Sequence, residues 1–285
     1  MQSEIETPQD TNKSINFSLN GIKLDEPLVM GILNVTPDSF FDGGQNFSNE
    51  EIVRKVNAME YEGAKIIDIG GYSSRPGAAN ISEEEELNRV LPIVKLIRSN
   101  FKDILISVDT FRSKIAEECF NAGANIINDI SGGTLDNKMF DTVSKLKAPY
   151  VLMHIKGSPQ DMQNNPTYSD VTKEVYQYFE EKIQELNTKG VYNIILDPGF
   201  GFGKTVEHNY ELLKNLDQFS SLNLPVLVGF SRKSMINKVI NTSPEEALNG
   251  TSVLNTLALT KGAKILRVHD AKEANECIQL INQVK

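Results

Sequence analysis

A repeated junction between helix, glycine and strand constrains this chain more than any other feature. Four predicted helices end in a glycine that leads directly into an apolar run, at Gly63-Ala-Lys-Ile-Ile, Gly123-Ala-Asn-Ile-Ile, Gly190-Val-Tyr-Asn-Ile-Ile and Gly262-Ala-Lys-Ile-Leu. Glycine suits this position because it adopts the left-handed conformation that ends a helix without steric cost. The junctions therefore predict a chain that alternates between helix and strand.

The predicted strands are short, nearly continuous apolar runs, which is typical of parallel strands covered on both faces. We expect strands near 28–34, 65–70, 104–109, 125–130, 150–154, 194–197, 225–230 and 265–269. We expect helices at 49–61, 83–100, 113–121, 138–145, 171–188, 207–219, 245–260 and 271–284. Eight alternating pairs predict an α/β fold, a (β/α)8 TIM barrel, with a doubly wound sheet as the alternative.

The N-terminal residues do not follow this alternation. Residues 1–14 are polar and lack periodicity, so we expect a disordered tail. Residues 15–24 alternate between apolar and polar around Asn20-Gly21, the favoured type I′ turn, and predict an N-terminal β-hairpin that closes one end of the fold. We expect residues 15–285 to form a single domain.

Composition limits the possible partners and the compartment. The formal net charge of -9 disfavours binding to nucleic acids or to anionic membranes, so an anionic substrate would need a local basic cluster. The two cysteines, Cys119 and Cys277, lie in predicted helices without metal-ligand spacing, as expected in a reducing compartment. No apolar run approaches the ~20 residues of a membrane span, and no signal pattern opens the chain. We expect a cytoplasmic protein.

Polar residues stand at or near the ends of most predicted strands. In a parallel barrel the carboxyl ends of the strands meet on one face, which carries the active site. A doubly wound sheet offers no explanation for so many polar strand ends, although a buried structural network remains an alternative for one or two of them. The predicted ring comprises Asn34, Asp109, Asn128, His154, Asp197, Ser231 and His269.

Several motifs resemble those of one enzyme family. The stretch Asn34-Val-Thr-Pro-Asp-Ser-Phe-Phe-Asp-Gly-Gly44 resembles the first signature of dihydropteroate synthases, the pterin-binding enzymes of folate synthesis, and Asp68-Ile-Gly-Gly-Tyr-Ser-Ser-Arg-Pro-Gly-Ala78 resembles the second. The resemblance extends from residue 28 to the C-terminus. It continues through Ser107-Val-Asp-Thr110, Asn128-Asp-Ile130, Leu152-Met-His154, Asp197-Pro-Gly-Phe-Gly-Phe-Gly-Lys204, Gly229-Phe-Ser-Arg-Lys-Ser234 and Arg267-Val-His269.

The resemblance implies a transferase that joins 4-aminobenzoate to the methylene group of a dihydropterin diphosphate and releases pyrophosphate. A pterin edge presents adjacent donors and an acceptor, which carboxylate and amide groups can bind. The residues that match the family's pterin-binding positions are Asp109, Asn128, Met153, Asp197 and Lys233. Asp109 has an alternative role as a cap of the helix that begins at Ser113.

The remaining site residues follow from the same resemblance. Arg267 and His269 lie two positions apart on one strand, so both face the same side, and a guanidinium can fork onto phosphate oxygens. The diphosphate set is Asn34, Arg75, Arg267 and His269, with Asn34 also a ligand of Mg2+, which would arrive with the substrate. The aminobenzoate set is Ser74, Arg75, Pro76, Phe202 and Ser231. The catalytic set is Lys233, Asp197, Arg267 and His269.

Strand periodicity predicts that Ser231 and Lys233 point the same way and that Arg232 forms an ion pair outside the barrel. The glycine-rich stretch from Asp197 to Lys204 is not a Walker phosphate loop, because Pro198 stands where that motif needs glycine. We expect the acidic run at 83–86 to be a solvated helix start.

Other features leave alternatives open. Two residues depart from the family pattern. Tyr72 stands where Glu or Ala is more usual, and Ser74 where Thr is common. The effect of Tyr72 has no predicted direction. His154 fits a ligand contact and a buried core histidine equally well, whereas His208 is expected on the surface. Family analogy suggests a homodimer, through late helices such as 245–260. A pterin-dependent methyltransferase and a non-catalytic pterin-binding paralogue are the functional alternatives.

Overall fold

The computed structural model describes residues 18–19, 22–36, 48–73 and 80–284. The predicted tail, 1–14, and the candidate residues Ser74, Arg75 and Pro76 lie outside this range. Among the described residues, no helix is long and apolar enough to cross a membrane.

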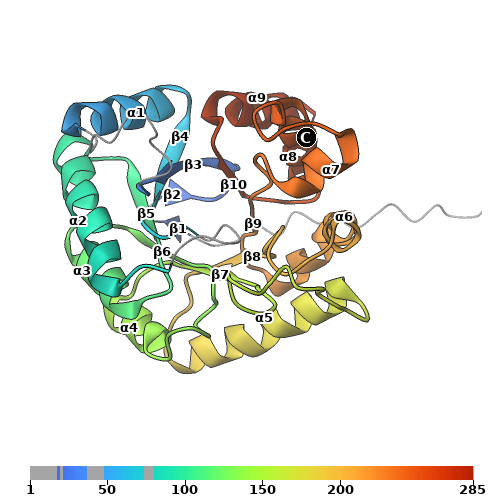
Figure 1. Ribbon diagram of the computed structural model, residues 1–285, viewed down its shortest axis with the longest axis horizontal. Coiled ribbons are helices and arrows are strands. Elements are labelled where there is room, and N and C mark those ends of the chain that lie inside the picture. Colours follow the sequence, from blue (N-terminus) through green and yellow to red (C-terminus); the bar gives the residue numbers. More distant parts are fainter. Residues whose placement is uncertain (1–17, 20–21, 37–47, 74–79, 285) are drawn as a thin grey trace, which may run out of the picture.

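The described strands form a parallel barrel with helices around it, which confirms the predicted (β/α)8 architecture (Figure 1). Their spatial order is β8-β7-β6-β5-β4-β3-β10-β9, and a parallel bridge between Leu196 and Val226 links the two outer strands and closes the ring. The strands are β3 (Leu28–Asn34), β4 (Ala64–Gly70), β5 (Leu105–Asp109), β6 (Ile126–Asp129), β7 (Tyr150–Met153), β8 (Ile194–Asp197), β9 (Leu227–Val228) and β10 (Ile265–Val268).

Four helices begin and end where the sequence predicts, namely α1 (Asn49–Tyr61), α2 (Glu83–Asn100), α3 (Ser113–Asn121) and α5 (Val171–Thr188). The others are α4 (Met139–Leu146), α6 (Val206–Lys214), α7 (Ser234–Ile240), α8 (Leu248–Thr260) and α9 (Ala271–Asn282). The four junction glycines, Gly63, Gly123, Gly190 and Gly262, have φ angles of 106°, 112°, 77° and 92°, as the left-handed position after a helix requires.

Two regions differ from the prediction. The helix expected at 207–219 is divided into α6 and a 3-10 helix, Leu216–Leu222. The strand expected at 225–230 is regular only over β9, and the chain then turns, with Arg232 at a φ of 60°. Helix α7 follows directly and was not predicted.

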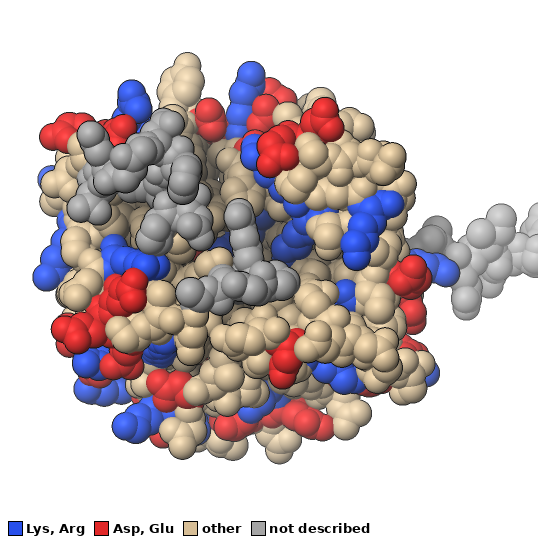
Figure 2. Space-filling view, viewed as in Figure 1, with Lys and Arg blue, Asp and Glu red and all other residues tan. Residues whose placement is uncertain are grey.

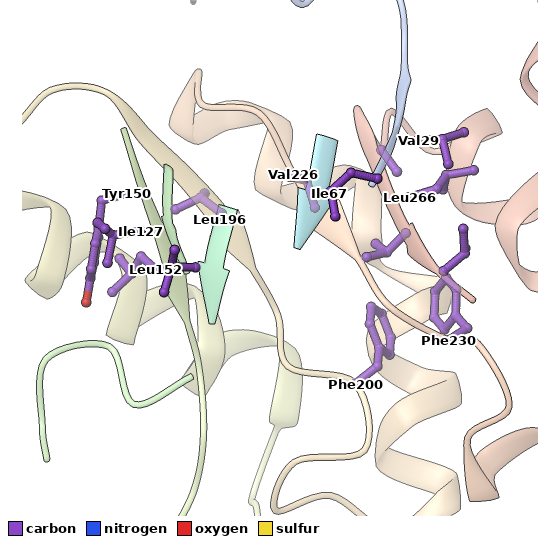
Figure 3. Packing of buried hydrophobic residues seen from close by; sticks show 14 of the residues in the cluster. Val29, Ile67, Ile127, Tyr150, Leu152, Leu196, Phe200, Val226, Phe230 and Leu266 are labelled. Carbon is purple, nitrogen blue, oxygen red and sulfur yellow. The ribbon is translucent and has the colours of Figure 1, made fainter. Parts of the chain in front are cut away.

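The outward faces of the strands form one core with the helices. Side chains that alternate along the strands, such as Ile127, Leu152 and Leu196, pack together beneath the surrounding helices (Figure 3). Phe200 and Phe230, from the segments after β8 and β9, extend this core with their ring centroids 4.5 Å apart. This shell fixes the barrel but does not reach the inside of the ring.

The inward faces form a second apolar cluster near the start of each strand. It contains Met30, Ile66, Leu105, Ile126, Val151, Ile195, Leu227 and Ile265. Leu19 and Leu24, from the small hairpin of β1 (Ser18–Leu19) and β2 (Ile22–Lys23), belong to the same cluster and are 1% exposed. The described part of the predicted hairpin therefore closes the amino end of the barrel.

Candidate active site

On five strands, the residue two positions after the member of this apolar cluster is polar, and these residues form a polar layer inside the barrel; on β7 the corresponding residue is Met153. Side chains alternate in direction along a strand, so a residue two positions later faces inward again. The step leads from Ile66 to Asp68, from Leu105 to Ser107, from Ile126 to Asn128, from Val151 to Met153, from Ile195 to Asp197 and from Ile265 to Arg267. The barrel interior thus changes from apolar to polar within one side-chain step.

Asp68 joins four elements of this layer. It is fully buried, and its carboxylate accepts hydrogen bonds from Ser107 Oγ at 2.6 Å, Asn128 Nδ2 at 3.1 Å and Arg267 Nε at 2.7 Å. A buried carboxylate is stable only when it is paired and hydrogen-bonded. Sequence reasoning missed Asp68 as a site residue because it considered only strand ends. The signal that could have found it is the single charged side chain among the inward positions of an otherwise apolar strand.

Asn128 is oriented by Asp68. A carboxylate only accepts hydrogen bonds, so the amide nitrogen of Asn128 must face Asp68 and its carbonyl oxygen must face elsewhere. Asn128 is 3% exposed and stands beside Asp109 in the register between β5 and β6. The predicted reader of the pterin edge is therefore held in one orientation before any ligand binds.

Arg267 bridges two carboxylates. Its Nε contacts Asp68, and its Nη2 contacts Asp109 Oδ2 at 2.8 Å. Burial disfavours the guanidinium charge, but the two carboxylates outweigh that effect and raise the pKa of Arg267. The expected anion clamp is therefore not an unpaired fork, and an incoming anion would meet only the N–H groups that these carboxylates leave unused.

Asp109 faces this network rather than the start of α3. Arg112 is the N-cap residue of α3, and the backbone N–H of Ser113 donates to Asp136, so the alternative role of Asp109 as a cap is wrong. Burial raises the pKa of the Asp109 carboxyl, while Arg267 opposes the shift.

Asn34 lies across Gly70 from Asp109. The strand register places Asn34 beside Gly70 and Gly70 beside Asp109. A Cβ atom at Gly70 would stand 3.4 Å from Asn34 Oδ1 and 3.8 Å from Asp109 Oδ2. The missing side chain therefore leaves a space with oxygen atoms on both sides.

Asp197 and Lys233 form the opposite part of the site. Asp197 accepts a hydrogen bond from the backbone N–H of Gly199 at 2.8 Å, and burial raises its pKa while Lys233 opposes the shift. The Lys233 ammonium donates to the carbonyl of Phe200 and lies 4.7 Å from the centre of the Phe202 ring. Burial lowers the pKa of Lys233 to about 8. The structure thus brings together three residues that the sequence placed at the pterin and aminobenzoate.

Ser231 and His269 form a pair after β9 and β10. Ser231 Oγ lies 2.9 Å from His269 Nδ1 and accepts the His269 backbone N–H at 3.2 Å. Arg232 forms an ion pair with Asp270 at 2.7 Å, as predicted. The reason given for it was wrong, because these residues lie in a turn and not in an extended strand.

His154 does not belong to the polar ring. It follows the inward-facing Met153, so it faces the opposite way, where its Nδ1 lies 3.0 Å from the Nζ of buried Lys204. Burial lowers its pKa to about 2, which keeps the ring neutral. Of the two predicted alternatives, the structure favours the buried core histidine.

Two other expectations are corrected. Glu86 is fully buried, not solvated, and it accepts hydrogen bonds from Thr110 at 2.7 Å and from Arg112 at 2.6 Å. His208 is half-buried, not simply on the surface, because it closes a capping box with Thr205 at the start of α6.

Tyr72 has a defined place in the structure. Its hydroxyl accepts a hydrogen bond from Gln160 at 2.8 Å, and its ring packs edge-on against Phe111 with centroids 5.1 Å apart. It therefore connects the segment after β4 to the segments after β5 and β7. Met153 is buried at the end of β7, beside Asp197 in the neighbouring strand.

The distribution of charged side chains on the face shown in Figure 2 is compatible with small anionic substrates. Acidic side chains lie mostly toward the rim of the face in Figure 2, whereas several Lys and Arg side chains lie nearer its centre. Within the described ranges, no group of three or more His, Cys, Asp or Glu side chains could hold a metal ion. Mg2+ commonly keeps several waters and takes other ligands from substrate phosphates.

Comparison with known proteins places these features in one family. A family model described as pterin binding enzyme matches residues 30–269. A dihydropteroate synthase of Escherichia coli K12 is 46% identical over 262 residues, which cover 91% of this chain and 92% of that protein.

Solved structures agree with the relatives. Yersinia pestis dihydropteroate synthase, in a sulfonamide drug complex, has a TM-score of 0.89 at 40% identity and covers 94% of this chain and 98% of its own. The Xanthomonas albilineans enzyme with 4-aminobenzoic acid has a TM-score of 0.88 at 38% identity, with coverage of 95% and 98%. The chain therefore belongs to the pterin-binding enzyme family and, within it, to the dihydropteroate synthases.

Proposed function

We propose that this chain condenses 4-aminobenzoate with (7,8-dihydropterin-6-yl)methyl diphosphate to give 7,8-dihydropteroate and pyrophosphate, a step of folate biosynthesis. A bond forms between the amine nitrogen and the methylene carbon, the bond from that carbon to the diphosphate oxygen breaks, and the amine loses a proton. The observation that carries this assignment is the network of Asp68, Asn128, Asp109 and Arg267 inside the barrel.

The pterin role follows from how this network is held. Asp109, Asn128 and Asp197 present carboxylate and amide oxygens to a ring edge that carries N–H donors, and Met153 supplies an apolar contact beside them. Because Asp68 fixes Asn128 and Arg267, these groups need little rearrangement when the pterin binds. Electrostatic stabilisation by preorganised polar groups is usually the largest single contribution to enzyme catalysis.

The diphosphate role belongs to the residues around Gly70 and β10. Ser231 Oγ lies 2.9 Å from Nδ1 of His269 and accepts the His269 backbone N–H, so the hydroxyl fixes the orientation of an imidazole that can donate a hydrogen bond to an anion. We assign Arg267 and His269 to the diphosphate, with Asn34 and Arg75. Asn34 would also hold Mg2+ together with the diphosphate, and the metal supplies positive charge for the leaving group.

The aminobenzoate role belongs to the other side of the site. The Lys233 ammonium lies 4.7 Å from the centre of the Phe202 ring, where the segments after β8 and β9 meet. We assign Lys233 to the junction of the two substrates, and Phe202, Ser231, Ser74, Arg75 and Pro76 to the aminobenzoate. The aromatic amine is neutral near pH 7, so the site needs to orient it more than to deprotonate it.

The direct test is turnover by the purified protein. It is incubated with Mg2+, 4-aminobenzoate and the dihydropterin diphosphate, and pyrophosphate and dihydropteroate are measured together. Equal molar amounts of both products are expected. Pterin binding without either product would contradict the proposal and favour the methyltransferase or the non-catalytic paralogue. The named relatives and structures favour the synthase over both.

We also propose that the protein is a homodimer through α7 and α8. Apolar side chains on these helices are exposed, including Ile240 at 52%, Val253 at 50% and Leu257 at 45%. Contiguous exposed apolar surface marks an interaction site more often than a free surface. In light scattering, the wild type should have the mass of two chains, and Val253→Glu should shift it toward one. A wild-type monomer would contradict the proposal.

A cytoplasmic location is the remaining part of the proposal. Cys119 and Cys277 are both buried and unpaired, which is consistent with a reducing compartment. Fractionation of cells that produce the protein should recover it with cytoplasmic markers. Recovery in an exported fraction would contradict this assignment.

A further inference from the structure

The loop between β8 and α6 is held by an unusual number of side chains. Every backbone carbonyl from Gly199 to Lys204 accepts a hydrogen bond from a side chain. The donors, in order along the loop, are Lys204, Lys233, Gln163, Lys204 again, Tyr168 and Asn209. A surface loop normally leaves many carbonyls to water, so this loop is built to keep one shape.

Lys204 lies at the centre of this arrangement. Its side chain is 3% exposed, and its ammonium lies 3.0 Å from the carbonyl of Gly199, 3.1 Å from that of Phe202 and 3.0 Å from His154 Nδ1. A phosphate-binding loop directs backbone N–H groups at an anion. Here a glycine-rich loop directs carbonyls at a cation of its own chain.

Glycine makes this close wrapping possible. Gly199 has a φ of 69°, and a Cβ atom there would stand 1.9 Å from the carbonyl oxygen of His154. No other residue fits, so the loop backbone packs directly against the segment after β7. Lys204 also joins the two segments, because its ammonium lies 3.4 Å from the same His154 oxygen.

His154 serves as the acceptor on the second segment. An ammonium has only donors, so Nδ1 of His154 must lack a hydrogen. The lowered pKa of the imidazole agrees with a neutral ring. Its ring packs edge-on against Tyr178 with centroids 5.0 Å apart, and the Tyr178 hydroxyl donates to the carbonyl of Met153.

The loop that Lys204 holds carries both contacts of Lys233. The carbonyl of Phe200 accepts from the Lys233 ammonium, and the ring of Phe202 lies beside it. The backbone N–H of Phe202 in turn donates to the carbonyl of Gly199 at 3.0 Å, so the two loop carbonyls that Lys204 binds are the two ends of one turn. The position of the Phe202 ring therefore depends on the buried ammonium.

We propose that Lys204, with His154 as its acceptor, is a positioning residue that fixes Phe202 and Lys233 as the wall of the aminobenzoate site. The proposal rests on the synthase function proposed above. It assigns neither residue a contact with substrate.

The test compares variants in steady-state kinetics and in equilibrium binding of a dihydropterin without diphosphate. Lys204→Met keeps the length of the side chain and removes the ammonium. It should raise the KM for 4-aminobenzoate roughly tenfold or more, since hydrogen bonds to a charged group are lost, while pterin affinity, to which Lys233 also contributes, should fall by a smaller factor. Lys173→Met is the control, because Lys173 is an exposed lysine of α5 that pairs with Asp170 and not with the loop; it should leave both values unchanged.

A second pair tests the acceptor without removing the lysine. The side-chain oxygen of Asn can replace Nδ1, so His154→Asn should stay within about threefold of wild type, whereas His154→Leu should resemble Lys204→Met. If Lys204→Met fails to fold, this pair of His154 variants still tests the proposal.

Three results would overturn the proposal: an unchanged aminobenzoate KM in Lys204→Met, equal losses for both substrates, or identical behaviour of the two His154 variants. Failure of the synthase function is distinguishable from all of these, because the wild type would then make no dihydropteroate.

Discussion

The two inward layers of the barrel are one side-chain step apart, yet their chemistry is opposite. Among the described residues, the layer at the amino end is an apolar cluster closed by Leu19 and Leu24. The layer at the carboxyl end contains Asp68, Asn128 and Arg267 in one hydrogen-bonded network. The comparison teaches that one strand can serve stability and function at positions i and i+2, provided that its alternation is kept.

The largest loss of activity is expected when Arg267, in the polar layer, is replaced. Arg267→Ala leaves two carboxylates without their cation and removes N–H donors for the diphosphate. Use of the diphosphate substrate, measured as kcat/KM, should fall by roughly 100-fold or more, about 3 kcal/mol. Affinity for pteroate, which lacks the diphosphate, should fall far less. Equal losses for both ligands would remove Arg267 from the diphosphate role.

The orientation of Asn128 provides the next test. Asn128→Asp replaces the donor that faces Asp68 with a second carboxylate, so two like charges would lie within hydrogen-bond distance. Pterin affinity should fall by roughly 10- to 100-fold in calorimetry. If the variant bound the pterin as tightly as wild type, the Asn128 amide would not be the group that hydrogen-bonds the pterin edge.

The pH dependence sharpens the comparison at Lys233. Its pKa is lowered to about 8, so the ammonium is present below that value and is lost as pH rises through it. The value of kcat/KM for 4-aminobenzoate should therefore decline above about pH 8. Asp197 and Arg267 face the same group. Burial lowers the pKa of Lys204 to about 7, so loss of its ammonium should appear as a separate decline that begins nearer pH 7.

A charge-retaining variant isolates the contribution of Lys233. Lys233→Arg should be less active overall, but it should lose the decline above about pH 8 because a guanidinium does not titrate there. A decline of the same form in Lys233→Arg would assign the pH dependence to another group, with Lys204 as the first candidate.

The smallest kinetic effect is expected at the amino end. Leu19→Ala removes a buried side chain that closes the barrel and should lower the free energy of unfolding by about 2–5 kcal/mol. The kinetic constants of the folded enzyme should remain within about twofold of wild type. A selective change in pterin affinity would show that the hairpin communicates with the polar layer.

Local sequence signals predicted most of the fold. Helix boundaries such as Asn49–Tyr61 were predictable because caps, glycines and apolar spacing all lie within the segment itself. The segment after β9 was not, because a two-residue strand followed by a turn at Arg232 has the same apolar pattern as a longer strand. Periodicity alone does not separate these cases.

The positions of several candidate residues inside the barrel were predictable, but Asp68 and the connections between these residues were not. Asp109, Asn128, Asp197 and Lys233 were found from strand position and family resemblance. The network that orients them depends on partners distant in sequence, as when Arg267 pairs with Asp68. Glu86 is a similar case, since only the fold brings Arg112 to a glutamate in an acidic helix start.

The most direct test of the two-layer account compares two variants of the same strand. Asp68→Asn and Ile66→Ala lie one side-chain step apart on β4, and each should lower the melting temperature. Pterin affinity is then measured by calorimetry on the folded fraction of each. The account predicts a loss of roughly 100-fold in Asp68→Asn and less than about threefold in Ile66→Ala. Similar affinities in the two variants would contradict it.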